Sequence, residues 1–343
     1  MNQTAVKPTS KANFTGIDIG KFLMAIIIII PHAYPALDRD ALWNTVFSVT
    51  VPFFFFATGF LLYKKIFLPD RINFDVIKGS MTKMLRLYIF WSAVYFPLAV
   101  YDFVRNNYSF KKAVFSYLRN FLFIGKNYNS WQLWYLLSSV LAFAVVFFLL
   151  KKGLKLETIC VISGFAYVLS MLLLHWVLRP DTLHGWFKKA IDIYGLFFGD
   201  SKIFCGFTYT ALGLLFGKYY LDRSKINLWI YIPMLIVGAF CRYYFFSPFN
   251  FLCSVVLAVP FFLIFLKINP KPGKIFLYFR RASAVIYFTH LIFISIYTII
   301  LRRNPEALGW GAFAFALVCC LILTYIVMNL ETNPKFAWLK KIF

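Results

Sequence analysis

The residues best suited to chemistry lie in the first apolar stretch of the chain. Asp18 and Lys21 stand near its start, and His32 follows eleven residues after Lys21. Eleven residues make about three turns of an α-helix, so these side chains would share one face, with Lys21 and His32 roughly 16 Å apart along the axis. Ionisable groups inside an apolar helix are costly and indicate a functional role. A histidine can take a proton from a hydroxyl near neutral pH, and a lysine can hold an anion.

Each of these residues also has a structural interpretation. Lys21 could reach the headgroups at the inner surface of a membrane, with Asp18 as its salt-bridge partner. His32 could lie at the outer interface, just before the break expected at Tyr34 and Pro35. The shared helical face favours the functional interpretation for the three residues together.

The composition of the chain requires a membrane protein. Of its 343 residues, 61% are hydrophobic and only 14% are charged, whereas soluble chains average about 45–50% apolar and about 25% charged residues. No interior of this size could hide the excess apolar surface, which must therefore face lipid. The same numbers exclude disordered, collagen-like and disulfide-rich secreted proteins.

The hydropathy pattern predicts an all-α, polytopic integral membrane protein with about ten transmembrane helices. Strand alternation typical of a β-barrel is absent. An amphipathic stretch at 110–123 is expected along the membrane interface. The predicted spans are 15–36, 44–63, 81–102, 131–150, 157–178, 202–221, 226–246, 248–267, 281–302 and 308–330.

Basic residues indicate the orientation and one class of ligand. Most Lys and Arg residues fall in links on the side of the N-terminus, and such an excess marks the cytoplasmic side. We expect both termini in the cytoplasm, with 1–343 forming one transmembrane domain that includes short tails at 1–13 and 331–343. The 36 Lys and Arg residues against 13 Asp and Glu fit this topology and anionic lipid headgroups. A polyanionic cytosolic ligand is a second explanation, and nucleic acid is not an expected partner.

The sequence predicts no metal site. The six cysteines lie in or beside apolar segments, without C-x-x-C spacing and without a histidine at ligand spacing. Such cysteines are usually small packing residues.

Several motifs resemble those of the membrane-bound acyltransferase-3 family. The first-helix pattern of this family is a basic residue, ten residues and then histidine, as in Lys21 and His32. One departure is Thr58, where serine is commoner, and another is the lack of an acidic residue within 308–330. Gly213 and Gly217 form a G-x-x-x-G pair, which predicts close helix packing. Further segments similar to family motifs are 51–60, 83–88, 131–136, 212–217, 283–290 and 331–334.

The resemblance implies an acyltransferase of the O-acetyltransferase kind. Such an enzyme moves an acyl group, usually acetyl, from cytosolic acyl-CoA to a hydroxyl of an acceptor on the outer side. The acceptor would be a cell-surface glycan or its lipid-linked precursor. The protein is accordingly expected in a bacterial cell membrane, in contact with lipids, acyl-CoA and the acceptor.

Residue roles follow from the resemblance and from chemical requirements. His32 is the predicted general base, and Lys21 and Asp18 complete the predicted catalytic set. Trp134, Tyr287 and His290 are expected to contact substrate, although an aromatic belt would also explain Trp134 and core packing would explain His290. Six residues of a basic inner vestibule are expected to hold the acyl-CoA head by charge-assisted bonds: Lys64, Lys65, Lys83, Arg86, Arg280 and Arg281.

Two other classes of function remain open from the sequence. A small-molecule or glycan transporter without acyl transfer is compatible with buried charges in about ten helices. Against a transporter, the sequence shows neither an inverted repeat nor a pair of broken helices. A sensing or assembly module without turnover is the third interpretation.

Overall fold

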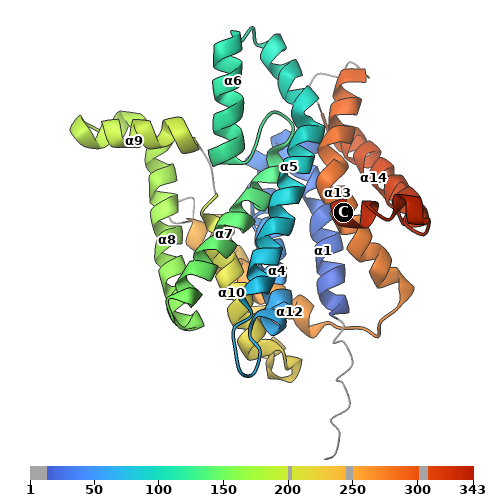
Figure 1. Ribbon diagram of the computed structural model, residues 1–343. Helices are drawn as coiled ribbons and strands as arrows, with labels where there is room; N and C mark the ends of the chain where they lie inside the picture. The colour runs from blue at the N-terminus through green and yellow to red at the C-terminus, as the bar shows by residue number, and fades with distance from the viewer. Residues whose placement is uncertain (1–13, 200–202, 245–249, 301–307) are drawn as a thin grey trace, which may run out of the picture.

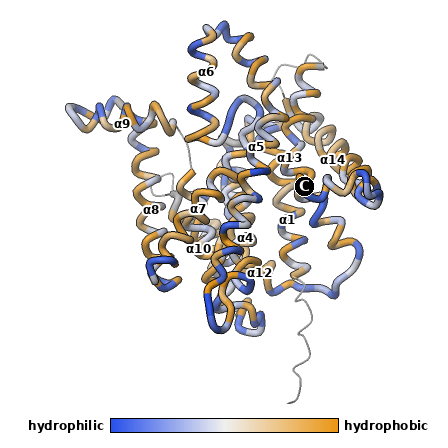
Figure 2. Tube along the Cα trace, in the orientation of Figure 1, coloured by the Kyte–Doolittle hydropathy of each residue, from blue (hydrophilic) through white to orange (hydrophobic). Residues whose placement is uncertain are grey.

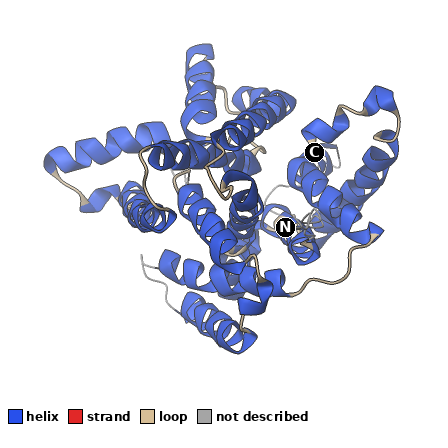
Figure 3. Cartoon of the chain, turned by 60° about the horizontal axis from the view of Figure 1, so that its bottom comes forward, coloured by secondary structure: helices blue, strands red, loops and turns tan. Residues whose placement is uncertain are grey.

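The computed structural model describes residues 14–199, 203–244, 250–300 and 308–343, and the predicted tail at 1–13 lies outside them. The described residues form helices joined by loops, with one isolated β-bridge between Phe67 and Ile72. Figure 3 views this arrangement from the end at which the first helix begins. The all-α prediction is therefore confirmed for this part of the chain.

The helices are labelled in Figure 1. They are α1 Thr15–Ile27, α2 Ile29–Ala33, α3 Ala41–Phe47, α4 Thr50–Ile66, α5 Phe74–Arg105, α6 Phe110–Arg119, α7 Trp134–Lys151, α8 Leu156–Val177, α9 Gly185–Phe198, α10 Cys205–Tyr220, α11 Leu228–Tyr244, α12 Asn250–Lys267, α13 Lys274–Ile300, α14 Trp310–Leu330 and α15 Leu339–Ile342. A 3₁₀ turn at Trp131–Leu133 precedes α7. Along α6 no residue is buried.

Seven stretches of the described chain are long and apolar enough to cross a membrane, so the prediction of about ten spans is confirmed in part. Figure 2 shows their hydrophobic residues along the helices and hydrophilic residues gathered at the turns. The predicted spans 202–221, 226–246 and 248–267 correspond to the shorter helices α10, α11 and α12. The seven stretches are Thr15–Ala33, Ala41–Ile66, Phe74–Arg105, Trp131–Lys151, Leu156–Val177, Lys274–Ile299 and Trp310–Leu330.

A proline interrupts the first apolar segment. Pro31 has no backbone N–H, and its ring clashes with the carbonyl four residues earlier, at Ile27. Helix α1 accordingly ends at Ile27, and α2 begins at Ile29. The predicted face nevertheless survives this break, because Asp18 on α1 and His32 on α2 both contact side chains of α13.

Glycines allow α4 and α10 to pack closely. A methyl group at Gly59 would lie 2.3 Å from the carbonyl oxygen of Thr210, and one at Gly213 would lie 2.4 Å from that of Phe56. Gly217 is equally close to an α4 side chain. The close packing predicted for the G-x-x-x-G pair is confirmed. It seats the Phe-rich stretch of α4 in the core.

Gly213→Ala should destabilise the protein, because the added methyl group meets backbone that cannot turn away. Overpacking of this kind typically costs about 1–3 kcal/mol. The measurement is the thermal unfolding midpoint of purified protein in detergent. Gly164→Ala on α8 is the matched control, since a methyl group there would meet nothing within 4 Å. Equal midpoints for the two variants would contradict the close packing.

Candidate functional site

A basic cavity of about 470 Å³ lies among α1, α4, α5, α7 and α13. Polar side chains on its wall include Thr58, Tyr135 and Tyr287, and the C-terminal segment adds Phe343. Five cationic side chains line it: Lys21, Lys83, Arg280, Arg281 and Lys340.

Two ion pairs hold the guanidinium groups of this cavity. Arg280 donates from Nε and Nη2 to the two carboxylate oxygens of Asp18, at 2.9 and 2.7 Å. Arg281 Nη2 donates to Glu331 Oε2 at 2.8 Å. Two carboxylates thus oppose five cations, and the cavity keeps an excess of positive charge. Such a surface suits a polyanion, which charge-assisted hydrogen bonds would hold.

The structure brings together half of the residues predicted to bind the donor. Lys83, Arg280 and Arg281 line the cavity, and Lys21 lies with them. Lys64, Lys65 and Arg86 are not among the described residues of its wall. Lys64 and Lys65 instead occupy the last turn of α4.

Asp18 lies at the basic cavity and fourteen residues before His32, which corresponds to about 21 Å of helical rise. Its side chain is only 6% exposed, and its two oxygens accept from Arg280. The structure therefore makes Asp18 a partner of a cavity guanidinium rather than a neighbour of the histidine.

Three hydroxyl groups line the cavity, those of Thr58, Tyr135 and Tyr287. The hydroxyls of Thr58 and Tyr135 lie 2.9 Å apart. Tyr287, on the cavity wall, donates its hydroxyl to the main-chain oxygen of Gln132. Gln132 is the neighbour of Trp131, which contacts His32. This hydrogen bond therefore joins the cavity wall to the segment that lies against the histidine.

His32 lies between two aromatic rings and is not among the residues that line the basic cavity. Its ring centroid is 5.5 Å from that of His290 on α13 and 5.4 Å from that of Trp131. The two residues come from distant parts of the chain, yet both contact the same imidazole. An imidazole can take a proton from a hydroxyl placed within hydrogen-bond reach, so this ring is a candidate general base.

The hydrogen bond of His290 determines which of its nitrogens can accept. Nδ1 lies 2.8 Å from the carbonyl oxygen of Ile286, and a carbonyl can only accept. In the neutral ring Nδ1 must therefore carry the hydrogen, which leaves Nε2 as an acceptor. Nε2 is buried and has no hydrogen-bond partner among the described residues.

Gln132 presents a second unpaired acceptor in the same region. Its Nε2 points to the carbonyl oxygen of Phe288 at 3.5 Å, which orients the amide. Its Oε1 is buried without a partner within the described chain. Unpaired buried polar groups are costly. These two buried acceptors, one on the histidine that stacks on His32 and one on the residue after Trp131, would be satisfied by a ligand that donates hydrogen bonds, such as a hydroxylated molecule.

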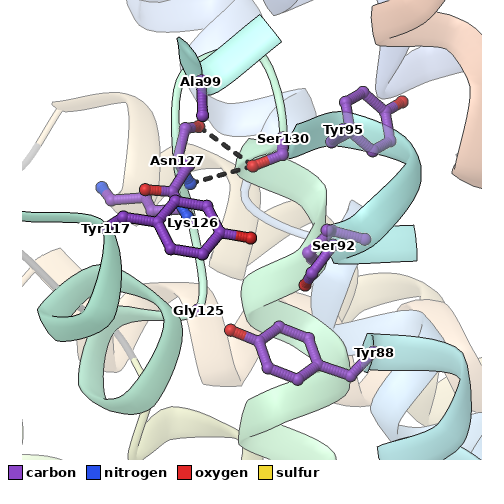
Figure 4. A pocket seen from close by; sticks show the side chains of 10 residues that line it. Tyr88, Ser92, Tyr95, Ala99, Tyr117, Gly125, Lys126, Asn127 and Ser130 are labelled. Carbon is purple, nitrogen blue, oxygen red and sulfur yellow. Dashed lines mark hydrogen bonds between the residues drawn. The ribbon is translucent and has the colours of Figure 1, made fainter. Parts of the chain in front are cut away.

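The loop 125–130 positions Trp131 and Gln132. Gly125 has φ of +80°, and a methyl group there would lie 2.7 Å from the Cα of Trp134. Asn127 N donates to Ser130 Oγ at 2.9 Å, and Ser130 Oγ donates back to Asn127 O at 3.1 Å. Figure 4 shows this turn beside a small pocket into which the Tyr88 hydroxyl points. Asn129 ties the loop to α13 through a 2.8 Å bond to Ser295 Oγ.

The two tryptophans of the 131–136 motif have different environments. Trp131 contacts His32 and is 38% exposed. Trp134, the predicted substrate contact, packs its ring 6.0 Å from that of Phe55 and its backbone against Gly125. The substrate contact predicted for Trp134 stays a prediction, and Trp131 is the tryptophan of this motif that contacts His32. Gln132, Tyr135 and Lys340 were not singled out from the sequence.

Comparisons with known proteins give one family and two relatives. A family model described as an acyltransferase domain matches residues 14–329. The chain is 26% identical over 362 residues to an "amino-acid racemase" of Enterococcus faecalis, covering 95% of this chain and 48% of the relative. It is 24% identical over 217 residues to a second protein of the same name and organism, covering 62% of this chain and 28% of the relative. The chain thus spans about half the length of these relatives or less, and no solved structure gives a significant match.

Lys83→Met should weaken the binding of a polyanion to the basic cavity. A charged hydrogen bond contributes about 1.5–3 kcal/mol, so the affinity should fall about tenfold or more. The measurement is equilibrium binding of adenosine 3′,5′-bisphosphate to detergent-purified protein at one fixed ionic strength. Lys65→Met is the matched control, since it removes the same charge from another exposed lysine, outside the cavity wall. Equal losses in the two variants would show that the ligand does not bind there.

Proposed function

The chain belongs to the acyltransferase 3 family, and from this we propose that it transfers an acyl group, by family habit acetyl, from acyl-CoA to a hydroxyl of an extracytoplasmic acceptor. The acceptor is a cell-surface glycan or its lipid-linked precursor. The protein works as a multi-pass protein of a bacterial cell membrane, with both termini in the cytoplasm. It carries the reaction within one transmembrane domain, 1–343.

One observation supports this proposal most directly. A cationic cavity and a stacked pair of histidines lie at opposite ends of the same helix pair, and a hydrogen bond from Tyr287 on the cavity wall to the main chain of Gln132 links the two regions. A donor with a polyanionic head and a long thin arm fits such a site, because its head and its reactive end need separate environments. Acyl-CoA has this shape.

In the proposed complex, the nucleotide phosphates bind Lys83, Arg280 and Arg281. Asp18 fixes the direction of the Arg280 guanidinium through its two-oxygen contact. Lys21 lines the same cavity and adds a charge near the start of the arm. The arm then passes Tyr135 and Tyr287, and the thioester reaches the histidines.

His32 acts as the general base in this proposal. It takes the proton of the acceptor hydroxyl as that oxygen attacks the thioester carbonyl carbon. The new C–O bond forms, the C–S bond breaks, and the leaving CoA sulfur receives the proton from His32. Holding both reactants at this point supplies much of the rate enhancement.

The acceptor binds to the two unpaired acceptor atoms. Neighbouring hydroxyls of a sugar would donate to His290 Nε2 and to Gln132 Oε1. The exposed edge of Trp131 borders the same place and would contact an apolar sugar face. Trp134 remains a proposed substrate-binding residue, but it acts indirectly, by holding the 125–130 loop in position.

A second candidate is transport of a small molecule without acyl transfer, which the buried charges in an apolar helix also suit. Because the relatives are named amino-acid racemase, an amino acid is the first small molecule to test. Those names belong to proteins about twice as long as this chain. Uptake of labelled L- and D-amino acids into sealed vesicles tests this candidate. Uptake without labelling of any membrane acceptor by labelled acetyl-CoA would favour transport over acyl transfer.

His32→Ala and His32→Gln should both abolish most acyl transfer, because neither side chain can take the hydroxyl proton. Loss of a general base typically lowers the rate by about 10²–10⁴. The assay follows label from acetyl-CoA into the glycan and lipid fractions of membrane vesicles that contain the protein. Binding of CoA should stay close to that of the wild type. A near-normal rate for His32→Gln would make His32 structural and His290 the next candidate base.

Lys21→Met should abolish turnover while leaving the protein folded and inserted, because the cavity loses the cation that α1, the helix leading to His32, contributes to its wall. Lys21→Arg should keep part of the activity, since it keeps the charge. The assay is the same label transfer, with the unfolding midpoint as the control for folding. Normal turnover in Lys21→Met would favour a lysine that only anchors the helix at the headgroups.

A further inference from the structure

The segment that follows α14 folds back against the helices of the basic cavity. It begins at Glu331, whose carboxylate accepts from Arg281. A 3₁₀ turn at Pro334–Phe336 and the short helix α15 follow, and Leu339 is buried. Figure 1 marks the end of this segment close to α13.

Three contacts hold the end of the segment. Trp91 Nε1 on α5 donates to the carbonyl oxygen of Ile342 at 3.1 Å. Arg281 Nη1 donates to the main-chain oxygen of Phe343 at 3.2 Å, and the Phe343 ring lies 5.5 Å from that of Trp91. Trp91 in turn stacks on Phe288 of α13 at 4.9 Å. The segment is therefore tied to α13, which carries both guanidinium groups of the cavity, and to α5, which carries Lys83.

This placement adds two residues to the cavity wall, Lys340 and Phe343. No ion pair joins Lys340 to an acidic side chain in the part of the chain that the structure describes. The adjacent Lys341 is exposed as well, but it does not line the cavity. The two neighbouring lysines thus differ in direction rather than in charge or exposure.

Adding Lys340 to four other cations is unfavourable in the empty cavity, because like charges repel. When an anion with several charges is bound, Lys340 attracts it, and the charge of Lys340 then stabilises the complex. A segment that blocked the site by mimicking an anionic ligand would present acidic side chains to the cavity. This one instead presents a cation and an aromatic ring, which suit a nucleotide with phosphates.

We propose that the C-terminal segment is part of the donor site, with Lys340 binding a phosphate of the acyl-CoA head and Phe343 forming an apolar wall beside it. The inference rests on the proposed function, because it assumes that the cavity binds acyl-CoA. It assigns to this segment a binding role in addition to its contacts with Arg281 and Trp91.

The test compares CoA binding by full-length purified variants in detergent at one fixed ionic strength. Lys340→Ala should weaken binding about fivefold, as expected for a single exposed charge pair. Lys340→Arg should bind almost as the wild type does, and Lys341→Ala should be unchanged. Raising the salt concentration should narrow the difference between Lys340→Ala and the wild type.

The outcomes separate this inference from the proposed function. Wild-type binding of CoA together with unchanged or tighter binding by Lys340→Ala would overturn the inference alone. Equal losses in Lys340→Ala and Lys341→Ala would also overturn it, since the effect would then come from overall charge. A wild-type protein that binds no CoA would overturn both proposals.

Discussion

A polar group inside a lipid-embedded helical bundle must find its partner within the protein, because lipid offers none. Most buried polar side chains of this chain obey that constraint locally. Thr289, Ser295 and Thr324 each donate to the carbonyl four residues earlier, and Asp18 finds Arg280. Against this background the unpaired atoms of Gln132 and His290 carry information. Four other buried polar atoms of the described chain are also unpaired, on Thr210, Arg223, Arg242 and Glu331. His290 is distinguished from these because its ring stacks on that of His32, and Gln132 because it follows Trp131, which contacts the same imidazole.

The pairing of the first apolar segment with α13 organises the two ends of the site. Asp18 meets Arg280 near the start of both helices, and His32 meets His290 further along both. The two helices therefore run in the same direction, and their polar side chains meet along one line. This line, from the Asp18–Arg280 pair to the His32–His290 pair, is called the polar seam. Charge is concentrated at one end of the seam, and neutral acceptors are concentrated at the other. This division matches a substrate whose charged head and reactive group lie far apart.

How much of the site the sequence could predict depended on whether the residues share an element. The face shared by Asp18, Lys21 and His32 follows from helical periodicity, which a single break at Pro31 did not destroy. Which lysines surround one cavity is a tertiary property, so Lys64 and Lys65 were grouped with Lys83 by charge alone. Trp131 and Trp134 differ by less than one turn, and only the loop anchored by Asn129 decides which one meets the histidine. Hydropathy also could not predict where a helix such as α10 begins and ends, because an apolar loop residue has the same hydropathy as an apolar helix residue.

The length of the seam also restricts the donor. Lys21 and His32 are eleven residues apart, which is roughly 16 Å of helix, and Lys83 and Arg281 surround the same cavity as Lys21. A small donor such as an acyl phosphate, bound by its charge in that cavity, would leave its acyl group far from the histidines. A donor bound only at the histidine end would leave the five cationic side chains of the basic cavity without a ligand. The distance between charge and base is therefore itself an argument for a donor that carries its acyl group on a long flexible arm.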